Sequence, residues 1–582
     1  MDKFFELRTI VIDLLKVILD EQGLENALPF SAVTVERPKS AGHGELSTNA
    51  AIVAAKSLGQ NPAWLAGELA ARLRLDSRLQ EVAVAGPGFI NLRLRPEVWM
   101  SIARTAVGAG PEFGRSNIGA GRRIHLEFVS ANPTGPLHVG HVRGAVYGDS
   151  LGRLLEFTGH DVVREYYVND GGAQVDALAR SAYLRYLEAN GSAVEFGDGE
   201  YVGEYLISVG IGLKERFGDE LIGKNEAEWL EPVRTYAISA MMDLIRKDLD
   251  LLGIEMDIFF SERSLQETGR IEEALAELDR RGLIYEGVLD PPKGSLPDDW
   301  EPRRQTLLRA TAHGDDVDRP VRKSDGSWTY FASDIAYHYD KIKRGYDELV
   351  NIFGADHGGY TKRLKAVVSA LSDGGMPFDI KLTQLVRVIT NEGASRMSKR
   401  AGQFVSLREA VEAVGPDVTR FVMLMRKNDA QLEFNFEEVR RQSKENPVFY
   451  VQYAHARICS VLERARSAGF RVDDSDLLDC NWSLLAHPDL VALARRVAEW
   501  PRTVDQASRH HEPHRIAFYL NELASDFHSL WSKGNSDAEL KLLDETQPDA
   551  STARIGLARS AGIVISSGLG ILGVTPISEM RN

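Results

Sequence analysis

The sequence predicts an α/β fold in which a domain built on a parallel sheet is preceded by a small α+β domain and followed by an all-α bundle. Apolar strands that end in polar or glycine-rich loops recur between residues 124 and 388, whereas helical spacing of apolar residues dominates after residue 418. A chain of 582 residues is also too long for a single hydrophobic core. We therefore expect three domains, at residues 1–116, 117–417 and 418–582.

Composition limits the classes of protein that the chain can represent. Hydrophobic residues make up 43% of the chain and charged residues 26%, as in soluble globular proteins. The formal net charge of −15 argues against a generally basic protein but does not exclude RNA, because phosphate contacts need only a local basic face. The two cysteines, Cys459 and Cys480, form no C-x-x-C pair, so the sequence contains neither a zinc ribbon nor a disulfide framework.

The first domain is predicted from a mixture of short elements. A helix over residues 4–19 is followed by a strand at residues 32–36, a helix that begins near Ala50, and a hairpin over residues 82–92. Charged residues interrupt the first helix at helical spacing, namely Glu6, Arg8, Asp13 and Lys16. This pattern indicates an amphipathic helix rather than a signal peptide, so we expect a cytoplasmic protein without a membrane partner.

The second domain begins with a strand, a tight loop and a helix. Residues 124–129 form an apolar, β-prone run, and the two prolines and the glycine of residues 132–136 end it. A helix with apolar residues at helical spacing then continues to Gly159, which we expect to cap it. The loop therefore lies where a parallel sheet usually binds its ligand.

The start of this helix carries the sequence His138-Val139-Gly140-His141. A helix N-terminus attracts anions, and Gly140 lets a flat base or a phosphate approach the backbone. His138 and His141 lie on one side of the helix start and can donate to phosphate oxygens. Taken alone, such a pair is more often a core or surface feature, or half of a zinc site.

The rest of the sheet is predicted from four further apolar runs, at residues 161–168, 328–331, 349–353 and 385–388. Polar loops follow them, and polar residues at the carboxyl ends of parallel strands bind ligands. A helix-rich insertion at about residues 190–320, with helices at 235–252 and 265–281, is expected to interrupt the sheet. After residue 437 a long helical stretch carries Tyr450 and Tyr453 on an apolar stripe, with Arg457 among basic residues, which is typical of a helix bundle with a charged surface.

Three segments carry a resemblance to a known family. His138-Val139-Gly140-His141 resembles the HIGH signature of class I aminoacyl-tRNA synthetases, and its flanks, residues 127–133 and 148–150, are similar to the arginyl-tRNA synthetase family. Arg396-Met397-Ser398-Lys399-Arg400 resembles the KMSKS signature, with arginines at both ends. Residues 445–457 resemble the anticodon-binding bundle that arginyl and cysteinyl enzymes share. The resemblance extends over nearly the whole chain.

This resemblance implies a class I synthetase Rossmann-like catalytic domain between an additional N-terminal tRNA-binding domain and a helical anticodon-binding domain. It implies a monomer that uses ATP and Mg²⁺ to activate L-arginine and then esterifies tRNA(Arg). The insertion is short for an editing site, and a guanidinium that is read by polar contacts should need none. A cysteinyl enzyme would need zinc ligands that are absent from the sequence.

The same resemblance implies roles for particular residues. Catalysis would involve His138, His141 and Lys399. ATP would be bound by Asn132, His138, Gly140, His141, Gly354, Asp356, His357, Met397, Ser398 and Lys399. L-Arginine would be bound by Glu127, Ser130, Asn132, Tyr330 and Asp334, because a guanidinium pairs bidentately with carboxylates. tRNA would be contacted by Arg37, Lys39, Tyr450, Tyr453 and Arg457. Gly358 stands where many synthetases of this class have a second histidine.

Two alternatives remain open at this point. A nucleotidyltransferase that acts on a small metabolite would share the H-x-G-H pattern and the parallel sheet, but it has no evident use for the two accessory domains. A catalytically silent tRNA-binding relative would not need His138, His141 and Lys399.

Overall fold

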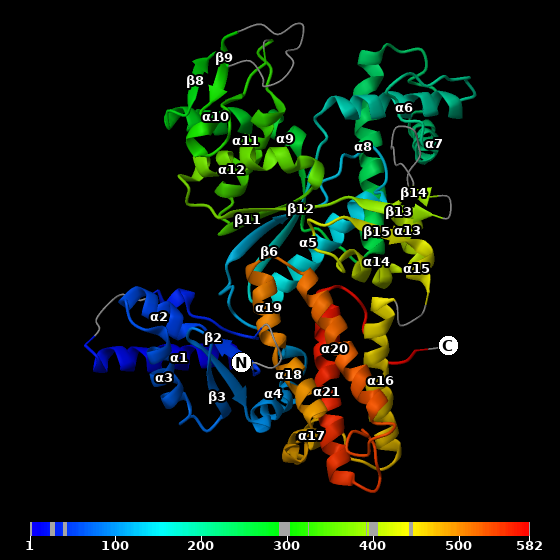
Figure 1. The fold of residues 1–582 in the computed structure, drawn as a ribbon. Coiled ribbons are helices and arrows are strands. Elements are labelled where there is room, and N and C mark those ends of the chain that lie inside the picture. Colours follow the sequence, from blue (N-terminus) through cyan, green and yellow to red (C-terminus); the bar gives the residue numbers. More distant parts are fainter. Residues whose placement is uncertain are drawn as a thin grey trace.

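The fold is a central parallel sheet with a small α+β unit and a long helix bundle below it and two further groups of elements above it (Figure 1). The computed structural model describes residues 3–23, 29–38, 44–289, 303–323, 325–390, 393–394, 405–441 and 446–580. Short 3-10 helices connect some of the elements: η1 (Phe30–Ala32), η3 (Gly110–Glu112), η4 (Ala310–His313), η5 (Ala355–Tyr360) and η6 (Trp482–Leu484).

The N-terminal unit is an antiparallel sheet covered by helices. Its strand order is β1-β2-β4-β3, and the predicted hairpin is confirmed as the antiparallel pair β3 and β4. The elements are α1 (Lys3–Glu21), β1 (Val35–Glu36), β2 (Leu46–Thr48), α2 (Ala50–Leu58), α3 (Pro62–Leu73), β3 (Leu79–Ala85) and β4 (Phe89–Leu94). The next helix, α4 (Pro96–Ala109), instead packs against three helices of the C-terminal bundle: α17 (Asp474–Asp479), α18 (Pro488–Ala498) and α21 (Pro548–Ile571).

The central sheet has five strands, all parallel, in the order β12-β11-β5-β6-β7. They are β5 (Arg123–Glu127), β6 (Asp161–Val168), β7 (Ile258–Ser261), β11 (Glu348–Gly354) and β12 (Phe378–Thr383). The α/β prediction is therefore confirmed. The first strand along the chain, β5, is the middle one, and its Ile124 and Leu126 are fully buried.

Two predicted strands of this sheet were wrong. Residues 328–331 are not a strand, because Thr329 accepts a hydrogen bond from the backbone N–H of Ala332 and caps α11 (Tyr330–Lys343). Of residues 385–388, the last three lie in β13 (Val386–Thr390), but that strand belongs to a separate sheet with β14 (Gly393–Ala394) and β15 (Leu432–Asn435). The actual edge strands of the main sheet are β7 and β12, which had not been predicted.

The prediction of one uninterrupted insertion was also wrong, because β7 returns to the sheet in its middle. The first excursion contains α6 (Ala173–Ala189), α7 (Tyr205–Phe217) and α8 (Glu226–Leu251), which share a core of their own. The second contains α9 (Glu262–Glu267), α10 (Arg270–Arg280) and the small sheet of β8 (Ile284–Gly287), β9 (Gln305–Leu308) and β10 (Arg319–Pro320). The two groups stand apart above the central sheet, the second beside α11 and α12 (Thr361–Ser372) (Figure 1).

The predicted helix after the tight loop is α5 (Val139–Phe157), which is buried along most of its length. Its close contact with the sheet depends on Gly148, where a Cβ atom would lie 2.2 Å from Cγ of Phe128. Gly159, which the sequence predicted to cap the helix, directly follows the C-cap residue Thr158 and has a φ of +85°, in the left-handed region.

The C-terminal part is helical, as predicted. Its helices are α13 (Leu407–Val414), α14 (Pro416–Met423), α15 (Phe436–Arg440), α16 (Pro447–Ser467), α17, α18, α19 (Trp500–Arg509), α20 (His514–Lys533) and α21. The long helices α16, α20 and α21 pack side by side around buried aliphatic residues. Within the described ranges, none of the helices is long and apolar enough to cross a bilayer.

Candidate functional site

A cavity of about 770 Å³ lies at the carboxyl edge of the central sheet. It is lined by the loops that follow β5, β6, β11 and β12 and by the first turns of α5, α9 and α11. The cavity brings together eleven residues that the sequence predicted for the site: Glu127, Ser130, Asn132, His138, Gly140, His141, Tyr330, Asp334, Gly354, Asp356 and His357. Met397, Ser398 and Lys399 lie outside the described residues.

His138 and His141 form one stacked unit at the start of α5, with their ring centroids 3.7 Å apart. Nδ1 of His138 accepts from the backbone N–H of Gly140 at 3.1 Å, and Nδ1 of His141 accepts from that of His138 at 3.2 Å. Because Nδ1 is an acceptor in both rings, the neutral imidazoles carry their proton on Nε2 and can donate from that atom. A Cβ at Gly140 would lie 2.8 Å from Cε1 of His138, so the glycine makes room for the ring.

The loop after β5 has a strained backbone. Val129 and Ser130 have φ values of +68° and +41°, which residues with a side chain rarely adopt. Hydrogen bonds fix this turn: Oγ of Ser130 accepts from the backbone N–H of Tyr167 at 3.1 Å and donates to Oε1 of Glu127 at 3.2 Å. Nδ2 of Asn132 donates to Oε1 of Gln174 at 2.8 Å. The strain thus aims polar side chains at the cavity.

Three carboxyl groups face the cavity in its acidic half: Glu127, Asp334 and Glu262. Burial raises the pKa of Glu262 to about 7, with further contributions from Asp334 and Asp170. Burial likewise raises the pKa of Asp334 to about 6, although its hydrogen bond from Tyr360 opposes the shift. For Asp334, the positive charges of Arg363 and Lys341 offset burial only in part, so the pKa values of both carboxyl groups stay raised.

Glu262, which sequence reasoning missed, follows β7 directly at the start of α9. Its signal was the short run Ile258-Phe259-Phe260, which, if taken as a strand, would have placed the next carboxylate at the ligand edge. Tyr360, whose hydroxyl donates to Oδ2 of Asp334, was missed as well. Tyr330 lies at the rim, since 63% of its surface is exposed.

The opposite side of the cavity is formed by η5, after β11. The side chains of Asp356 and His357 are exposed there and lie 3.6 Å apart. A Cβ at Gly354 would lie 2.4 Å from Oδ1 of Asp356, so a larger residue there would displace that carboxylate from its present position. At Gly358 the nearest atom to a Cβ, in Leu382, would be 3.6 Å away, so a larger residue would fit.

The residues predicted to contact tRNA lie far from this cavity along the chain. Arg37 forms an ion pair with Glu499, which joins the N-terminal unit to the bundle, and Lys39 lies outside the described residues. On α16, Nη2 of Arg457 donates to the Tyr453 hydroxyl at 2.6 Å, and its guanidinium lies over the rings of Tyr453 and Trp531. Tyr450 packs on His528 in the same cluster.

Comparisons with known proteins cover the whole chain. Three family models match: "Arginyl tRNA synthetase N terminal domain" at residues 7–94, "tRNA synthetases class I (R), catalytic domain" at residues 112–457 and "DALR anticodon binding domain" at residues 451–580. The arginine–tRNA ligases of Paracoccus denitrificans and Ruegeria pomeroyi are 59% and 58% identical over 581 residues, which is all of both chains.

Solved structures agree with these matches. A putative arginyl-tRNA synthetase of Campylobacter jejuni has a TM-score of 0.71 and 30% identity, and it covers 84% of this chain and all of its own. The Thermus thermophilus arginyl-tRNA synthetase has the same fold, with a TM-score of 0.69 at 20% identity over 99% of this chain and 100% of its own. With these likenesses and a cavity that combines paired imidazoles with clustered carboxylates, the chain belongs to the arginyl-tRNA synthetase family of class I aminoacyl-tRNA synthetases.

Proposed function

We propose that this protein is an arginine–tRNA ligase that activates L-arginine with ATP and transfers the arginyl group to tRNA(Arg). The observation that carries the proposal is the position of Glu127, Asp334 and Glu262 around one cavity that also contains His138 and His141. An amino acid with two cationic ends suits an acidic pocket, and a nucleotide suits the adjacent helix N-terminus.

L-Arginine is proposed to lie across the acidic half of the cavity. Its guanidinium faces Asp334 and Glu262, with Tyr330 at the rim, because a planar fork of donors pairs with carboxylates placed beside each other. Its α-amino and carboxylate groups face Glu127, Ser130 and Asn132. The carboxyl groups with raised pKa values support this orientation, since a bound guanidinium would stabilise their charged forms.

ATP is proposed to occupy the half of the cavity formed by α5 and η5. Nε2 of His138 and Nε2 of His141 donate to phosphate oxygens, while Gly140 keeps the helix start open. Gly354, Asp356 and His357 contact the ribose and base, and Met397, Ser398 and Lys399 are proposed to bind ATP, with Lys399 offsetting phosphate charge. No cluster of three metal-ligating side chains occurs among the described residues, so Mg²⁺ would be held mainly by the phosphates, whose charge it offsets when bound.

The chemistry consists of two displacements. A carboxylate oxygen of arginine attacks the α-phosphorus, the bond to the β-phosphate oxygen breaks, and pyrophosphate leaves. The 2′-hydroxyl of the terminal ribose of tRNA then attacks the acyl carbon, loses its proton and expels AMP. The side chains need only orient the reactants and offset the negative charge that spreads over the phosphate oxygens.

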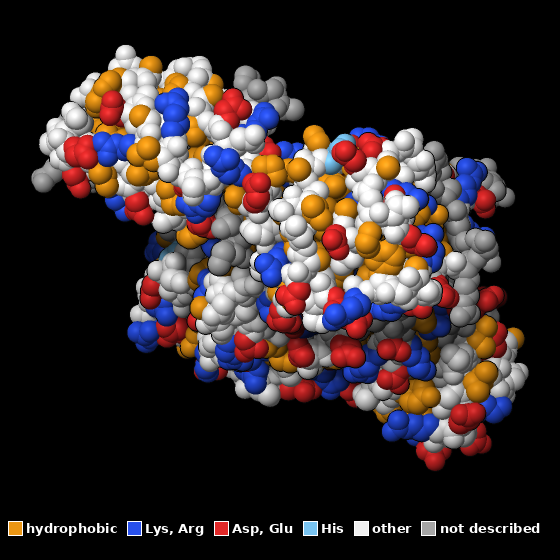
Figure 2. Space-filling view, turned by 90° about the horizontal axis from the view of Figure 1, so that it is seen from below, with side chains coloured by type: hydrophobic (Ala, Val, Ile, Leu, Met, Phe, Trp, Pro, Cys, Tyr) orange, Lys and Arg blue, Asp and Glu red, His pale blue; other side chains and the backbone are white. Residues whose placement is uncertain are grey.

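The accessory parts are proposed to bind tRNA. Tyr450, Tyr453 and Arg457, with the neighbouring Trp531, offer ring and guanidinium faces on which unpaired bases can stack. Arg37 and Lys39 are proposed phosphate contacts. Acidic and basic side chains are interspersed on the face seen in Figure 2, so that face offers Lys and Arg side chains despite the net negative charge of the chain. Domains at 1–116, 117–417 and 418–582 in a cytoplasmic monomer complete the proposal.

One assay tests the function directly. The protein is incubated with ATP, Mg²⁺, total tRNA and each labelled amino acid in turn, and the esterified amino acid is identified. Esterification of arginine alone is the expected result. Adenylyl transfer to a small metabolite without esterification of tRNA would instead identify a nucleotidyltransferase.

A further inference from the structure

A chain of buried polar side chains lies beneath the acidic half of the cavity. Nζ of Lys341, on α11, donates to Oε2 of Glu127 at 2.6 Å and to Oδ1 of Asn351 at 3.1 Å. Nδ2 of Asn351 lies 3.5 Å from Nε2 of His338, whose Nδ1 donates to the backbone carbonyl of Asp334 at 2.8 Å. Parallel pairing of β5 with β11 sets Asn351 directly beside Glu127. The chain therefore joins the two acidic positions of the cavity.

We infer that Lys341 is a positioning residue that holds the side chain of Glu127 in a fixed orientation, and thereby determines recognition of the α-amino group of arginine. This inference rests on the proposed function. Lys341 donates a hydrogen bond to one carboxylate oxygen of Glu127 and Ser130 donates to the other, so the carboxylate cannot rotate. Oε1 retains a lone pair for a substrate ammonium group, because each carboxylate oxygen can accept two hydrogen bonds.

The burial of Lys341 indicates a specific task. Its side chain is 0% exposed, and an ammonium group is costly to bury unless it is paired. Burial lowers the pKa of Lys341, and the carboxylates of Glu127 and Glu165 oppose that shift. Its Nζ also lies 4.1 Å from the centroid of the Tyr337 ring, which further stabilises the cation.

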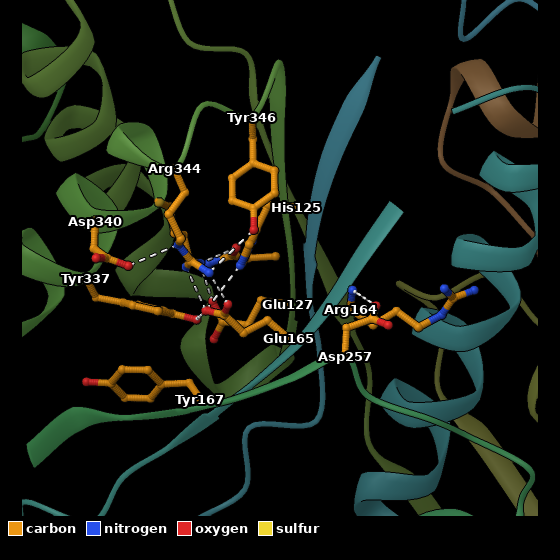
Figure 3. Close-up of polar contacts among 12 residues, drawn as sticks. His125, Glu127, Arg164, Glu165, Tyr167, Asp257, Tyr337, Asp340, Arg344 and Tyr346 are labelled. Atoms are coloured by element: carbon orange, nitrogen blue, oxygen red, sulfur yellow. Dashed lines mark hydrogen bonds and ion pairs between the residues drawn. The ribbon is translucent and has the colours of Figure 1, made fainter. Parts of the chain in front are cut away.

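The neighbouring carboxylate, Glu165, has a complete set of partners of its own. Figure 3 shows Arg344, Tyr337 and His125 converging on Glu165 beside Glu127. Arg344 donates to Glu165 at 2.5 and 3.0 Å and the Tyr337 hydroxyl at 2.6 Å, while Nε2 of His125 lies 3.2 Å away. Other side chains therefore supply the hydrogen bonds of Glu165, and Glu127 is the carboxylate to which Lys341 donates directly.

The test compares L-arginine with 5-guanidinopentanoate, which has the same guanidinium and carboxylate but no α-amino group. Binding of each to the full chain is measured by calorimetry for the wild type and for Lys341→Met. We expect L-arginine to bind at least about tenfold more weakly to the variant and 5-guanidinopentanoate to bind unchanged or more tightly. In aminoacylation the change should appear in the KM for arginine rather than in kcat. The matched control is Lys343→Met on the same helix, whose ammonium pairs with Glu273 at the surface and whose loss should change neither affinity.

A second comparison protects the test against a variant that does not fold. Glu127→Gln combined with Lys341→Met removes both charges of the buried pair, which costs less stability than removing one. The ratio of the affinities for L-arginine and 5-guanidinopentanoate should be the same in the double variant as in Glu127→Gln alone. Equal weakening of both ligands by Lys341→Met, no weakening of either, or an additive loss in the double variant would overturn the inference. Failure of the wild type to charge tRNA with arginine would refute the proposed function without altering these binding results.

Discussion

Glu262 and Asp334 are carboxyl groups held in an environment that disfavours their charge. Burial raises the pKa of each group, and a neighbouring carboxylate raises it further: Asp334 for Glu262, and Glu127 for Asp334. The guanidinium of the proposed substrate would lower both pKa values. Carboxyl groups placed in this way lower the stability of the ligand-free protein and favour tight binding of a cationic ligand. The cost should be measurable in the protein without arginine.

We expect Glu262→Gln to stabilise the protein at pH 8 but much less at pH 5. The pKa of Glu262 is about 7 in the folded protein against an ordinary value of 4.5. Because the pKa of Glu262 is raised on folding, its contribution to the free energy of unfolding is fully present below pH 4.5 and is lost as the pH rises through 7. At pH 8 the wild type therefore has a buried charge that lowers its stability, and the glutamine variant does not. The gain should be roughly 2–3 kcal/mol larger at pH 8 than at pH 5. Thermal unfolding at both pH values measures it, and a gain that does not depend on pH would contradict this reasoning.

Glu267→Gln is the matched control for that measurement. Glu267 lies on the same helix, its side chain is 58% exposed, and it pairs only with Arg263 at the surface in the described contacts. Its replacement should change the unfolding temperature little at either pH.

We expect His138→Ala to reduce arginyl-adenylate formation by about 10² to 10³, the range for losing one donor to the transition state. The measurement is arginine-dependent exchange of pyrophosphate into ATP in the presence of tRNA. Arginine binding in calorimetry serves as the control and should persist, because the acidic half of the cavity is unchanged. A variant with normal exchange would remove His138 from the proposed mechanism.

At the scale of elements, the segment from β5 to α5 could be predicted because its signals are local. A continuous apolar run, two prolines and a C-terminal glycine leave only one arrangement of strand, loop and helix. The two edge strands could not be predicted in the same way. β7 has four residues and β12 is only partly buried, so neither has the apolar run of an inner strand.

The misassigned segment illustrates the same limit. Residues 328–331 are aromatic and β-branched, which favours a strand, but a capping hydrogen bond to Thr329 converts them into a helix start. The candidate site was predicted where strands were recognised, and Glu262 was missed because β7 was not. Lys341 could not be predicted at all, since its partner lies 214 positions away in the sequence.

The contact between α5 and the sheet gives a prediction at this scale. Gly148→Ala would drive a Cβ into the Phe128 ring, and overpacking of this kind costs roughly 1–3 kcal/mol. On the same helix, the nearest atom to a Cβ at Gly144 would be 3.7 Å away, so Gly144→Ala should be neutral or slightly stabilising. Chemical denaturation of both variants measures the difference. Equal stabilities would indicate that α5 can shift away from the sheet.

At the scale of the whole molecule, Arg420 joins distant parts of the chain. Its guanidinium on α14 donates to Asp149 on α5 at 2.5 Å, to the carbonyl of Leu572 at 2.8 Å and to the carbonyl of Leu252 at 2.9 Å. The side chain is 1% exposed. One buried residue therefore ties the helix of the candidate site to the end of α8 and to the end of α21.

We expect Arg420→Leu to lower the free energy of unfolding by about 3 kcal/mol, because it leaves a buried carboxylate and two carbonyls short of donors. Arg466→Leu should cost less than about 1 kcal/mol, since its ion pair with Glu463 is exposed. Denaturant titration compares the two, and limited proteolysis should show earlier cleavage between α14 and α21 in the first variant only. Equal losses in the two variants would contradict the joining role of Arg420.

The packing of α4 on the C-terminal bundle has a consequence during synthesis. Trp99, Met100, Ile102 and Val107 of α4 are buried, and α4 packs on helices that include α21, which begins only at Pro548. Ribosomes add roughly 5–20 residues per second. The apolar face of α4 in a nascent chain therefore lacks α21 as a packing partner for tens of seconds. A chain that ends before α21 would leave uncovered the part of α4 that packs on that helix, which would make it a target for chaperones and proteases.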